Sequence, residues 1–253
     1  MDRDRAVEIQ RNALADWVAA MAHSSPEARL FQRDGVSAVA APACPARSIA
    51  NSTSFRSSER LFGALDELAT FYTEAGIEAW TVWVPEFDQE AIAGLVAAGH
   101  EFDGKPMAMI LDLTTFEAPD LGDLDWDAEA DPEEFGRVND AAYGYAAGAG
   151  YAAALAIRPD ELRVYRARVD GETACVLGTI DHADGDLGVY FVATDPALHG
   201  RGLATRLMTA ALLDARERGR VTSSLQASAM GEPVYRRLGY EPQFRLHLYE
   251  RRR

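Results

Sequence analysis

Apolar residues in the first part of the chain recur at helical spacing in some segments and alternate with polar residues in others. Residues 1–22 and the segment from Leu61 to Tyr72 place apolar side chains every three or four positions, which predicts two helices. Residues 28–55 carry short alternating runs broken by prolines, which is typical of strands and turns. The rest of this part predicts a strand, a helix and a further strand, at 79–84, 89–98 and 108–113.

The second part of the chain repeats this order. A helix is predicted from Asp131-Pro132 to about Tyr143, and a last strand near 244–249. Between them the pattern predicts three strands, at 162–169, 173–180 and 187–194, and then a helix with Leu203, Leu207 and Leu212 on one face. A strand at 221–227 and a short helix around Tyr235, which begins near Pro233 and ends at Gly239, follow. The expected fold class is therefore α/β (α+β).

Two pairs of turns place the two parts in register. Gly76 corresponds to Gly219 at an offset of about 143, and Gly99 to Gly239 at an offset of about 140. Two matches with the same element order between them predict a tandem pair of related domains. We assign residues 1–116 to the first domain, 117–122 to a linker and 123–253 to the second domain.

Length and composition favour a soluble enzyme. The chain has 253 residues, of which 48% are hydrophobic, and no apolar run approaches the length of a membrane span, about 18 residues. The N-terminus lacks the apolar core of a signal peptide, so a cytoplasmic location is expected. Only Cys44 and Cys175 are present, which argues against a disulfide scaffold.

The net charge and the residue spacing bear on which substrates, metals and macromolecules the protein could bind. The net charge of −15 argues against nucleic acid; it is compatible with a cationic amine substrate, and also with a surface that is simply kept soluble. No spacing of His, Cys and Asp indicates a metal site. We expect no membrane partner, and either a monomer or a homodimer.

A glycine-containing loop follows the strand that ends near Thr194. Gly200 and Gly202 precede the long helix, and Arg201 lies between them. A helix N-terminus has free N–H groups and a partial positive charge, so it suits an anion such as pyrophosphate. The loop lacks the Lys-Ser/Thr of a nucleoside triphosphate P-loop and the third glycine of a dinucleotide site. By itself it is also compatible with an ordinary strand-to-helix turn.

A second segment, Tyr235-x-x-x-Gly239-Tyr240, completes a recognisable pair of motifs. Together with Gly200-x-Gly202-x-Ala204 it resembles the GCN5-related N-acetyltransferases (GNAT family), over about residues 123–253. The resemblance implies two tandem GNAT-like domains, each with a mixed, mostly antiparallel sheet flanked by helices. It also implies acetyl-CoA as cosubstrate. By position it implies a cofactor site formed by Val192, Ala193, Thr194, His199, Gly200, Arg201, Gly202, Leu203, Ala204, Thr205 and Ser228. The sequence departs from the family at His199, where Gln or Arg is usual.

The same resemblance makes Tyr235 the candidate general acid that protonates the departing thiolate. The alternative is a core tyrosine whose hydroxyl is bound to the backbone. Ser228 either contacts the cofactor or only caps a turn. No general base is identified, since Asp195, Tyr190, Glu232 and water are all open.

The substrate wall is expected from the first helix of the second domain and the loop after it. Asn139, Tyr143 and Tyr145 are the candidate substrate-binding residues, and the alternative is that the tyrosines pack against the neighbouring domain.

The register also predicts that the first domain has lost its site. Glu59 and Leu61 stand opposite Gly202 and Ala204, and Leu95 stands opposite Tyr235. We therefore interpret the first domain as degenerate, with a structural or substrate-shaping role.

The sequence thus predicts an acyl-CoA-dependent N-acetyltransferase. It would act on a small-molecule amine by direct attack in a ternary complex and release coenzyme A. An acyl-CoA sensor or interaction module without turnover is the alternative from another class. A mycothiol-synthase-like acetyltransferase, which shares the tandem layout, is the alternative within the class.

Overall fold

The fold was analysed in a computed structural model, which describes residues 1–146, 148 and 150–253. The first part of the chain forms three α-helices and six strands with a short 3-10 helix. In chain order these are α1 (Arg3–Met21), β1 (Arg29–Arg33), β2 (Val36–Ala40), η1 (Ser48–Ala50), β3 (Ser52–Phe55), α2 (Ser58–Glu74), β4 (Ala79–Pro85), α3 (Gln89–Ala97), β5 (Glu101–Gly104) and β6 (Met107–Asp112).

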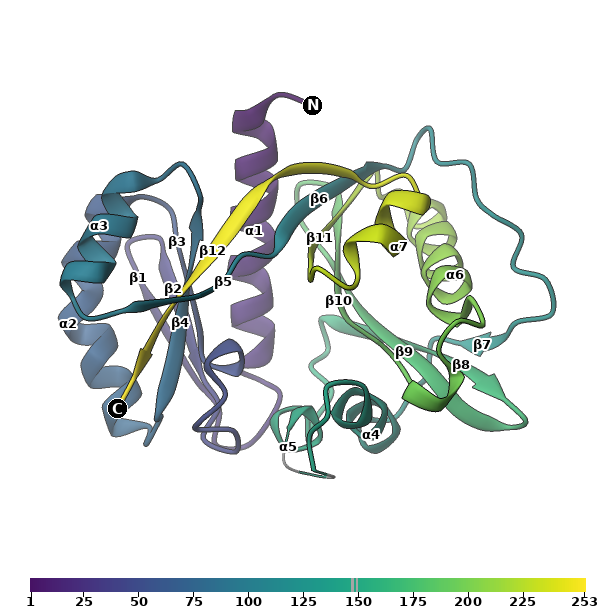
Figure 1. Cartoon of the computed structure of the whole chain (residues 1–253), viewed down its shortest axis with the longest axis horizontal. Coiled ribbons are helices and arrows are strands. Elements are labelled where there is room, and N and C mark those ends of the chain that lie inside the picture. The colour runs from purple at the N-terminus through teal and green to yellow at the C-terminus, as the bar shows by residue number, and fades with distance from the viewer. Residues whose placement is uncertain (147, 149) are drawn as a thin grey trace.

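The second part follows a similar order. Its elements are β7 (Asp125–Asp127), α4 (Pro132–Ala142), α5 (Tyr151–Ala154), β8 (Leu162–Val169), β9 (Glu172–Asp181), β10 (Asp186–Thr194), η2 (Pro196–Leu198), α6 (Leu203–Glu217), β11 (Thr222–Ala227), α7 (Glu232–Arg237) and β12 (Glu241–Arg252). The fold class is the expected one, a mixed and mostly antiparallel sheet flanked by helices (Figure 1).

One 12-stranded sheet runs through both parts, in the order β1-β2-β3-β4-β12-β6-β11-β10-β9-β8-β7, with β5 beside β12. Two neighbouring pairs are parallel, β3 with β4 and β10 with β11. The two parallel pairs are equivalent in the two parts. Helix α2 connects β3 to β4, and α6 connects β10 to β11.

The last strand of each part lies in the sheet of the other part. Strand β6 pairs antiparallel with β11 along Met107–Asp112. Strand β12 pairs through its first residues with β6 and through Leu246–Arg252 with β4. Figure 1 shows this exchange as the yellow strand β12 crossing toward α2 and α3 while the teal strand β6 runs toward β11. The sequence pattern did not indicate this exchange.

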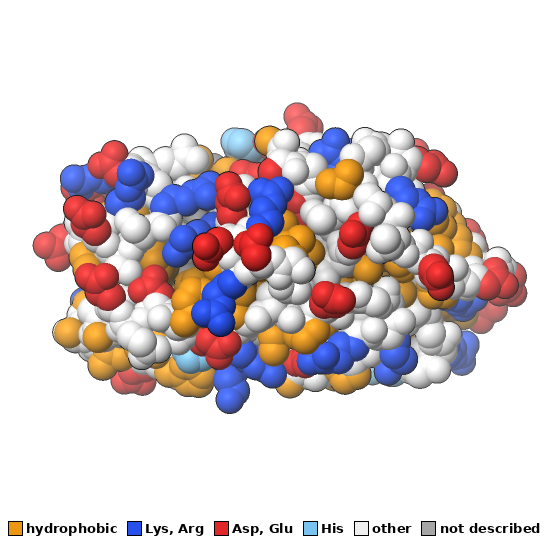
Figure 2. All heavy atoms as spheres, turned by 90° about the horizontal axis from the view of Figure 1, so that it is seen from above, with side chains coloured by type: hydrophobic (Ala, Val, Ile, Leu, Met, Phe, Trp, Pro, Cys, Tyr) orange, Lys and Arg blue, Asp and Glu red, His pale blue; other side chains and the backbone are white. Residues whose placement is uncertain are grey.

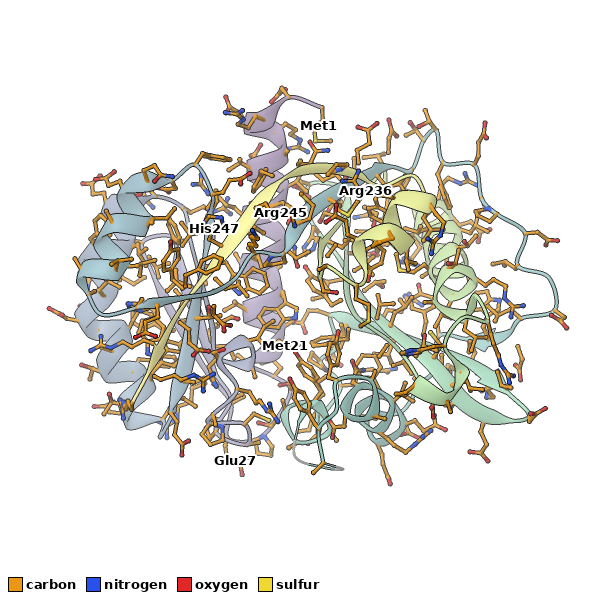
Figure 3. The ribbon with its side chains drawn as sticks, viewed as in Figure 1. Met1, Met21, Glu27, Arg236, Arg245 and His247 are labelled. Atoms are coloured by element: carbon orange, nitrogen blue, oxygen red, sulfur yellow. The ribbon has the colours of Figure 1, made fainter. Side chains whose placement is uncertain are left out.

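Helices cover the sheet on both sides of α1 and form two separate hydrophobic cores. Helices α2 and α3 pack on the sheet of the first part, and α6 packs on that of the second. Helix α1 stands between the two parts in Figure 3, where Met1 labels the residue just before it and Met21 its last residue. Its apolar side chains join both parts. Trp17 packs with Tyr190 and Phe191 of β10, whereas Leu14 packs with Trp83 of β4.

The turns that set the sequence register have matching backbone geometry. Gly76 and Gly219 have φ of +72° and +82°, and Gly99 and Gly239 have φ of +84° and +94°. Each glycine ends a helix, and the amide of the residue after it returns to the carbonyl five positions earlier, for example Tyr240 to Tyr235 and His100 to Leu95.

His100, the residue equivalent to Tyr240, is buried without hydrogen-bond partners for either ring nitrogen among the described residues. Its ring meets the ring of Trp80 edge-on at 4.7 Å. Burial, and then the positive charge of Arg251, lower its pKa to about 4. The unfolded chain, with an ordinary histidine pKa near 6.5, therefore binds more protons than the folded chain between these two pH values.

We expect this histidine to make the protein acid-sensitive. Its contribution should be full above about pH 6.5 and be lost as pH falls toward 4, by up to about 3 kcal/mol in the free energy of unfolding. Urea denaturation between pH 4.5 and 7.5 checks this when wild type is compared with His100→Phe. The substitution should flatten the pH dependence, and an unchanged slope would contradict the assignment.

Candidate functional site

The two parallel strands of the second part separate after three residue pairs. Strand β10 pairs with β11 only from Asp186 to Gly188. The register with β9 shifts between Tyr190 and Ala193, and Phe191 has a φ of +56°, which is rare for an aromatic residue. This bulge turns β10 away from β11. The edge of Val192–Thr194 that faces β11 therefore has no strand partner.

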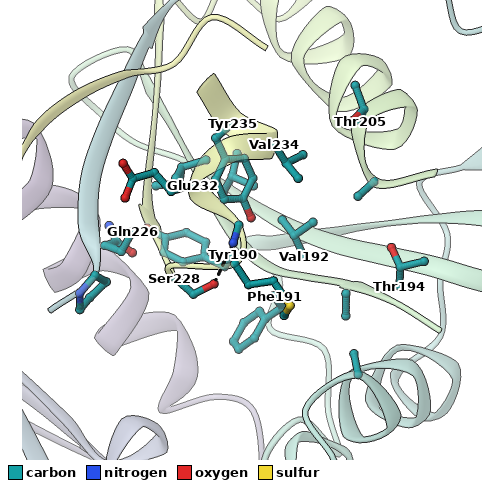
Figure 4. A pocket seen from close by; sticks show the side chains of 18 of the residues that line it. Tyr190, Phe191, Val192, Thr194, Thr205, Gln226, Ser228, Glu232, Val234 and Tyr235 are labelled. Atoms are coloured by element: carbon teal, nitrogen blue, oxygen red, sulfur yellow. Dashed lines mark hydrogen bonds between the residues drawn. The ribbon is translucent and has the colours of Figure 1, made fainter. Parts of the chain in front are cut away.

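A cleft of about 1160 Å³ opens where the strands separate. Side chains from both parts of the chain line it, and Figure 4 shows several of those from the second part. Strand β10, the loop 198–206 and the segment 228–237 form one side. Helix α1, β4, the turn at Lys105-Pro106 and β12 form the other side.

The glycine loop (residues 199–205) fits an anion. Gly202 is the N-cap of α6 with a φ of +73°, and no side chain caps the helix. Gly200 has a φ of +80°, and a Cβ built on either glycine meets no atom within 4 Å. No acceptor among the described residues binds the backbone amides of 200–205. The predicted loop residues therefore come together as a group of free N–H donors that open on the cleft.

His199 makes a contact that the sequence did not indicate. Its Nε2 lies 3.0 Å from the carbonyl oxygen of Thr194, so this nitrogen donates to the backbone, and only Nδ1 is left to face a ligand. The Thr194 hydroxyl donates to the Cys175 thiol at 3.2 Å. Both residues line the cleft, as predicted, but with these groups already hydrogen-bonded.

Tyr235 points from α7 toward β10 in Figure 4. Its ring packs edge-on against Tyr240 at 6.0 Å, and its hydroxyl has no hydrogen-bond partner among the described residues. Burial, and then the neighbouring Tyr143 and Cys175, raise its pKa well above that of free tyrosine. The hydroxyl therefore carries its proton in the resting protein and is free to donate it.

Ser228 lies at the start of the turn that leads into α7. Its hydroxyl accepts from the amide of Gly231 at 3.1 Å, and its side chain also lines the cleft. The serine thus caps the turn, which was one of the two alternatives from the sequence.

The substrate wall is only partly the one predicted. Tyr143 lines the cleft, and so does Tyr151 of α5. Tyr145 instead lies under the guanidinium of Arg47, 3.6 Å from its ring centroid, and does not line the cleft. Asn139 is fully buried in α4, where its amide donates to the Phe135 carbonyl at 2.9 Å. Helix packing thus uses the Asn139 side chain, and Tyr145 packs against the first part, which is the alternative given for the tyrosines from the sequence.

The two carboxylates that were candidate bases already have ion-pair or hydrogen-bond partners. Glu232 pairs with Arg236 at 2.8 Å and with Arg245 at 3.4 Å, on neighbouring elements that Figure 3 shows. These contacts, the Arg236 hydrogen bond first, lower the pKa of its carboxyl. Asp195 accepts from the amide of Ala197 at 2.9 Å.

Tyr190 directs its hydroxyl away from the cleft. The hydroxyl donates to the Ala13 carbonyl of α1 at 2.9 Å. It also lies 3.3 Å from Nε2 of His182, whose Nδ1 is 2.7 Å from Asp16 of α1. This chain of contacts ties α1 to the second part.

At the equivalent place the first part has smaller cavities, the larger of them a pocket of about 340 Å³ between the end of β3 and the β1–β2 turn. Helix α2 is capped by the side chain of Ser57 and has Glu59 in its first turn. Leu61 and Leu95 are fully buried. The cavity near the ends of β3 and β4 measures about 10 Å³, because α1 and β12 side chains fill it.

Two further features bear on the class of protein. Among the described residues no group of three His, Cys, Asp or Glu side chains could hold a metal ion. None of the described helices has the length and apolarity needed to cross a membrane.

Comparison with known proteins agrees with this geometry. Residues 186–243, which include β10, the glycine loop, β11 and α7, match the family model for the acetyltransferase (GNAT) domain. No match was found among curated proteins. A segment of the second part is therefore similar to an acetyltransferase (GNAT) domain.

Solved structures show that the likeness extends over the whole chain. A GCN5-related N-acetyltransferase from Kribbella flavida is 19% identical, with 94% of each chain covered and a TM-score of 0.64. A tandem GNAT protein from the clavulanic acid biosynthesis pathway is 15% identical, with 99% of this chain and 96% of that chain covered and a TM-score of 0.63. The chain thus has the tandem GNAT fold.

Proposed function

We propose that the protein transfers an acetyl group from acetyl-CoA to the amine of a small molecule. The observation that carries this proposal is one cleft that joins free helix N-terminal amides at one end to the unpartnered hydroxyl of Tyr235. The first group suits the diphosphate of coenzyme A, and the second suits its departing sulfur.

The cofactor would lie along β10. The amides of 200–205 and the guanidinium of Arg201 hold the diphosphate. The free edge of Val192–Thr194 offers backbone groups to the amides of the pantetheine chain, as an added strand would use them. The bulge at Phe191 keeps β11 away from this edge.

Direct attack by the amine is favoured over an acyl-enzyme. Burial raises the pKa of Cys175 to about 12, and it also raises that of Cys44. Both thiols are buried and hydrogen-bonded, so neither is a ready nucleophile. In the proposed step the amine nitrogen bonds to the thioester carbon, the carbon–sulfur bond breaks, and Tyr235 gives its proton to the sulfur. The acylated nitrogen then loses a proton, which restores the Tyr235 hydroxyl through water.

The role of Tyr235 can be tested with Tyr235→Phe. We expect kcat to fall by about 10- to 100-fold, since general acid catalysis is removed, while the Kd for acetyl-CoA stays the same. Coenzyme A release and calorimetry measure the two quantities.

Tyr240→Phe is the matched control. It removes a hydroxyl that is bound to Ser223 at 2.7 Å outside the cleft, so it should lower stability and leave kcat unchanged. Full activity of Tyr235→Phe would refute the acid role. Tight binding of acetyl-CoA without release of coenzyme A over an amine panel would favour a sensor.

A further inference from the structure

We infer that the acceptor is a monoamine with an apolar aromatic or alkyl body, bound in an arm of the cleft that both parts of the chain build. This inference rests on the proposed acetyl transfer and names the class of amine. The apolar arm is defined by Leu14, Trp17, Trp83, Tyr190, Phe191 and Leu248.

The walls of the apolar arm come from four different elements. Helix α1 supplies Leu14 and Trp17, β4 supplies Trp83, β10 supplies two aromatic residues and β12 supplies Leu248. Trp17, Trp83 and Leu248 are each 7% exposed. These side chains give this part of the cleft an apolar lining, so the apolar surface of a ligand that contacts them would supply binding energy.

The apolar arm joins the acetyl site directly. Tyr190 and Phe191 immediately precede Val192–Thr194 on β10, where the thioester would lie. On the facing strand Gln226 comes two residues before Ser228, and its amide is held by Gln10 of α1 at 2.8 Å. An amine in the arm thus reaches the carbonyl from the side opposite the glycine loop.

No acidic side chain belongs to the described lining of the apolar arm. The carboxylates elsewhere in the cleft are Glu232, which two arginines neutralise, and Asp120, which accepts from the Gly122 amide at 2.9 Å. Figure 2 shows side chains of both charge signs on the face of the molecule that is seen from above. A polyamine would have to bury additional ammonium groups without partners, which is costly.

The same environment explains how the amine loses its proton. Desolvation favours the neutral form of an amine, so the ammonium releases its proton to water on entry. The nitrogen then forms the new bond to carbon, the sulfur leaves with the Tyr235 proton, and the proton lost by the acylated nitrogen returns through water to Tyr235. Titratable and charged groups around the cleft and behind Tyr190 are Tyr143, Tyr151, Tyr190, His199, Glu232, Asp120, Lys105, Arg201, Arg206, Arg237, Arg245, Cys175, His182, Asp16 and Asp186.

Binding can be measured without turnover. Two of the four tryptophans of the chain line the apolar arm, so their fluorescence reports its occupancy. With the protein saturated in coenzyme A, phenethylamine should bind at least about tenfold more tightly than spermidine. Equal binding, or tighter binding of spermidine, would overturn the inference.

Two substitutions test the walls. Trp17→Ala should raise the KM for phenethylamine about tenfold with the Kd for acetyl-CoA unchanged, and Trp17→Phe should restore most of the loss. Trp126→Ala, on β7 outside the cleft, is the control and should change neither value. Ile49→Glu would add a carboxylate from half-buried η1 and should shift the preference toward spermidine.

The pH profile separates this inference from a base on the protein. The value of kcat/KM should rise with pH and level off at the solution pKa of each amine, and therefore earlier for benzylamine than for phenethylamine. A common plateau for both amines would assign a base to the protein and overturn the proton step.

Failure of the inference can be told from failure of the proposed function. If calorimetry shows no binding of acetyl-CoA, the proposed function itself fails. If acetyl-CoA binds and coenzyme A is released with spermidine but not with phenethylamine, only the inference about the acceptor fails.

Discussion

Gly202→Glu is expected to abolish acetyl-CoA binding. The substitution gives the second part the residue that the first part has at the equivalent Glu59. A carboxylate at the N-cap of α6 would occupy the free amides and repel a diphosphate. Such like-charge contacts cost several kcal/mol, so the Kd should rise by on the order of 100-fold or more. Calorimetry, and the loss of the thermal shift caused by acetyl-CoA, measure the effect.

The control must reproduce the strain of the new side chain. Gly202 has a positive φ, where any residue with a Cβ is disfavoured by about 1 kcal/mol. Gly219, at the other end of α6, has a φ of +82° and also open space around a built Cβ. Gly219→Glu therefore adds the same charge and strain but should leave the Kd unchanged. If both variants bind acetyl-CoA like the wild type, the glycine loop is not the diphosphate site.

The second large effect is expected from separating the two parts of the chain. Residues 1–116 and 123–253, expressed alone, each lack the strand that the other contributes. The second piece would lose β6, whose Ala108 and Met109 are fully buried between β11 and β12. Unpaired edges and exposed apolar residues should leave both pieces aggregated or without a cooperative melting transition. Circular dichroism melts and size-exclusion chromatography check this.

Co-expression provides the positive arm of this experiment. The two pieces together should form a complex that binds acetyl-CoA, because the exchanged strands can pair again. A protease site placed within 117–122 and cut after folding is the matched control, since the cut chain should elute as one species. Cooperative melting of the isolated 123–253 piece, with acetyl-CoA binding, would refute the structural need for exchange.

The site shows how far motifs in the sequence lead. Gly200 and Gly202 were predicted from a local pattern and Tyr235 from the resemblance to the family motif, and the structure brings all three to one cleft. Such positions are predictable because a positive φ and a helix start are local properties. Their roles in binding and catalysis stay predictions until they are measured. Asn139 and Tyr145 were placed in the substrate wall because they lie near it in sequence, and the packing of α4 and the contact with Arg47 direct their side chains elsewhere.

The short strands show how far the fold could be predicted from the sequence. Strands β5 and β7 were missed because neither segment carries a clear apolar alternation, as in Glu-Phe-Asp-Gly at 101–104. Their pairing comes from β12 and β8, which lie far away in the sequence. Hydrophobic periodicity shows which residues of a segment are buried, but it does not show pairing with a distant strand.

By itself the sequence determined the order of the longer helices and strands, the internal repeat, and the absence of the glycine motif from the first part. These follow from periodicity, turn residues and helix ends, which depend on a few neighbouring residues. Only the tertiary structure decided that β6 and β12 exchange places and that α1 supplies one wall of the cleft. Those features arise from backbone pairing and apolar contact between segments more than a hundred residues apart, which leave no pattern within either segment.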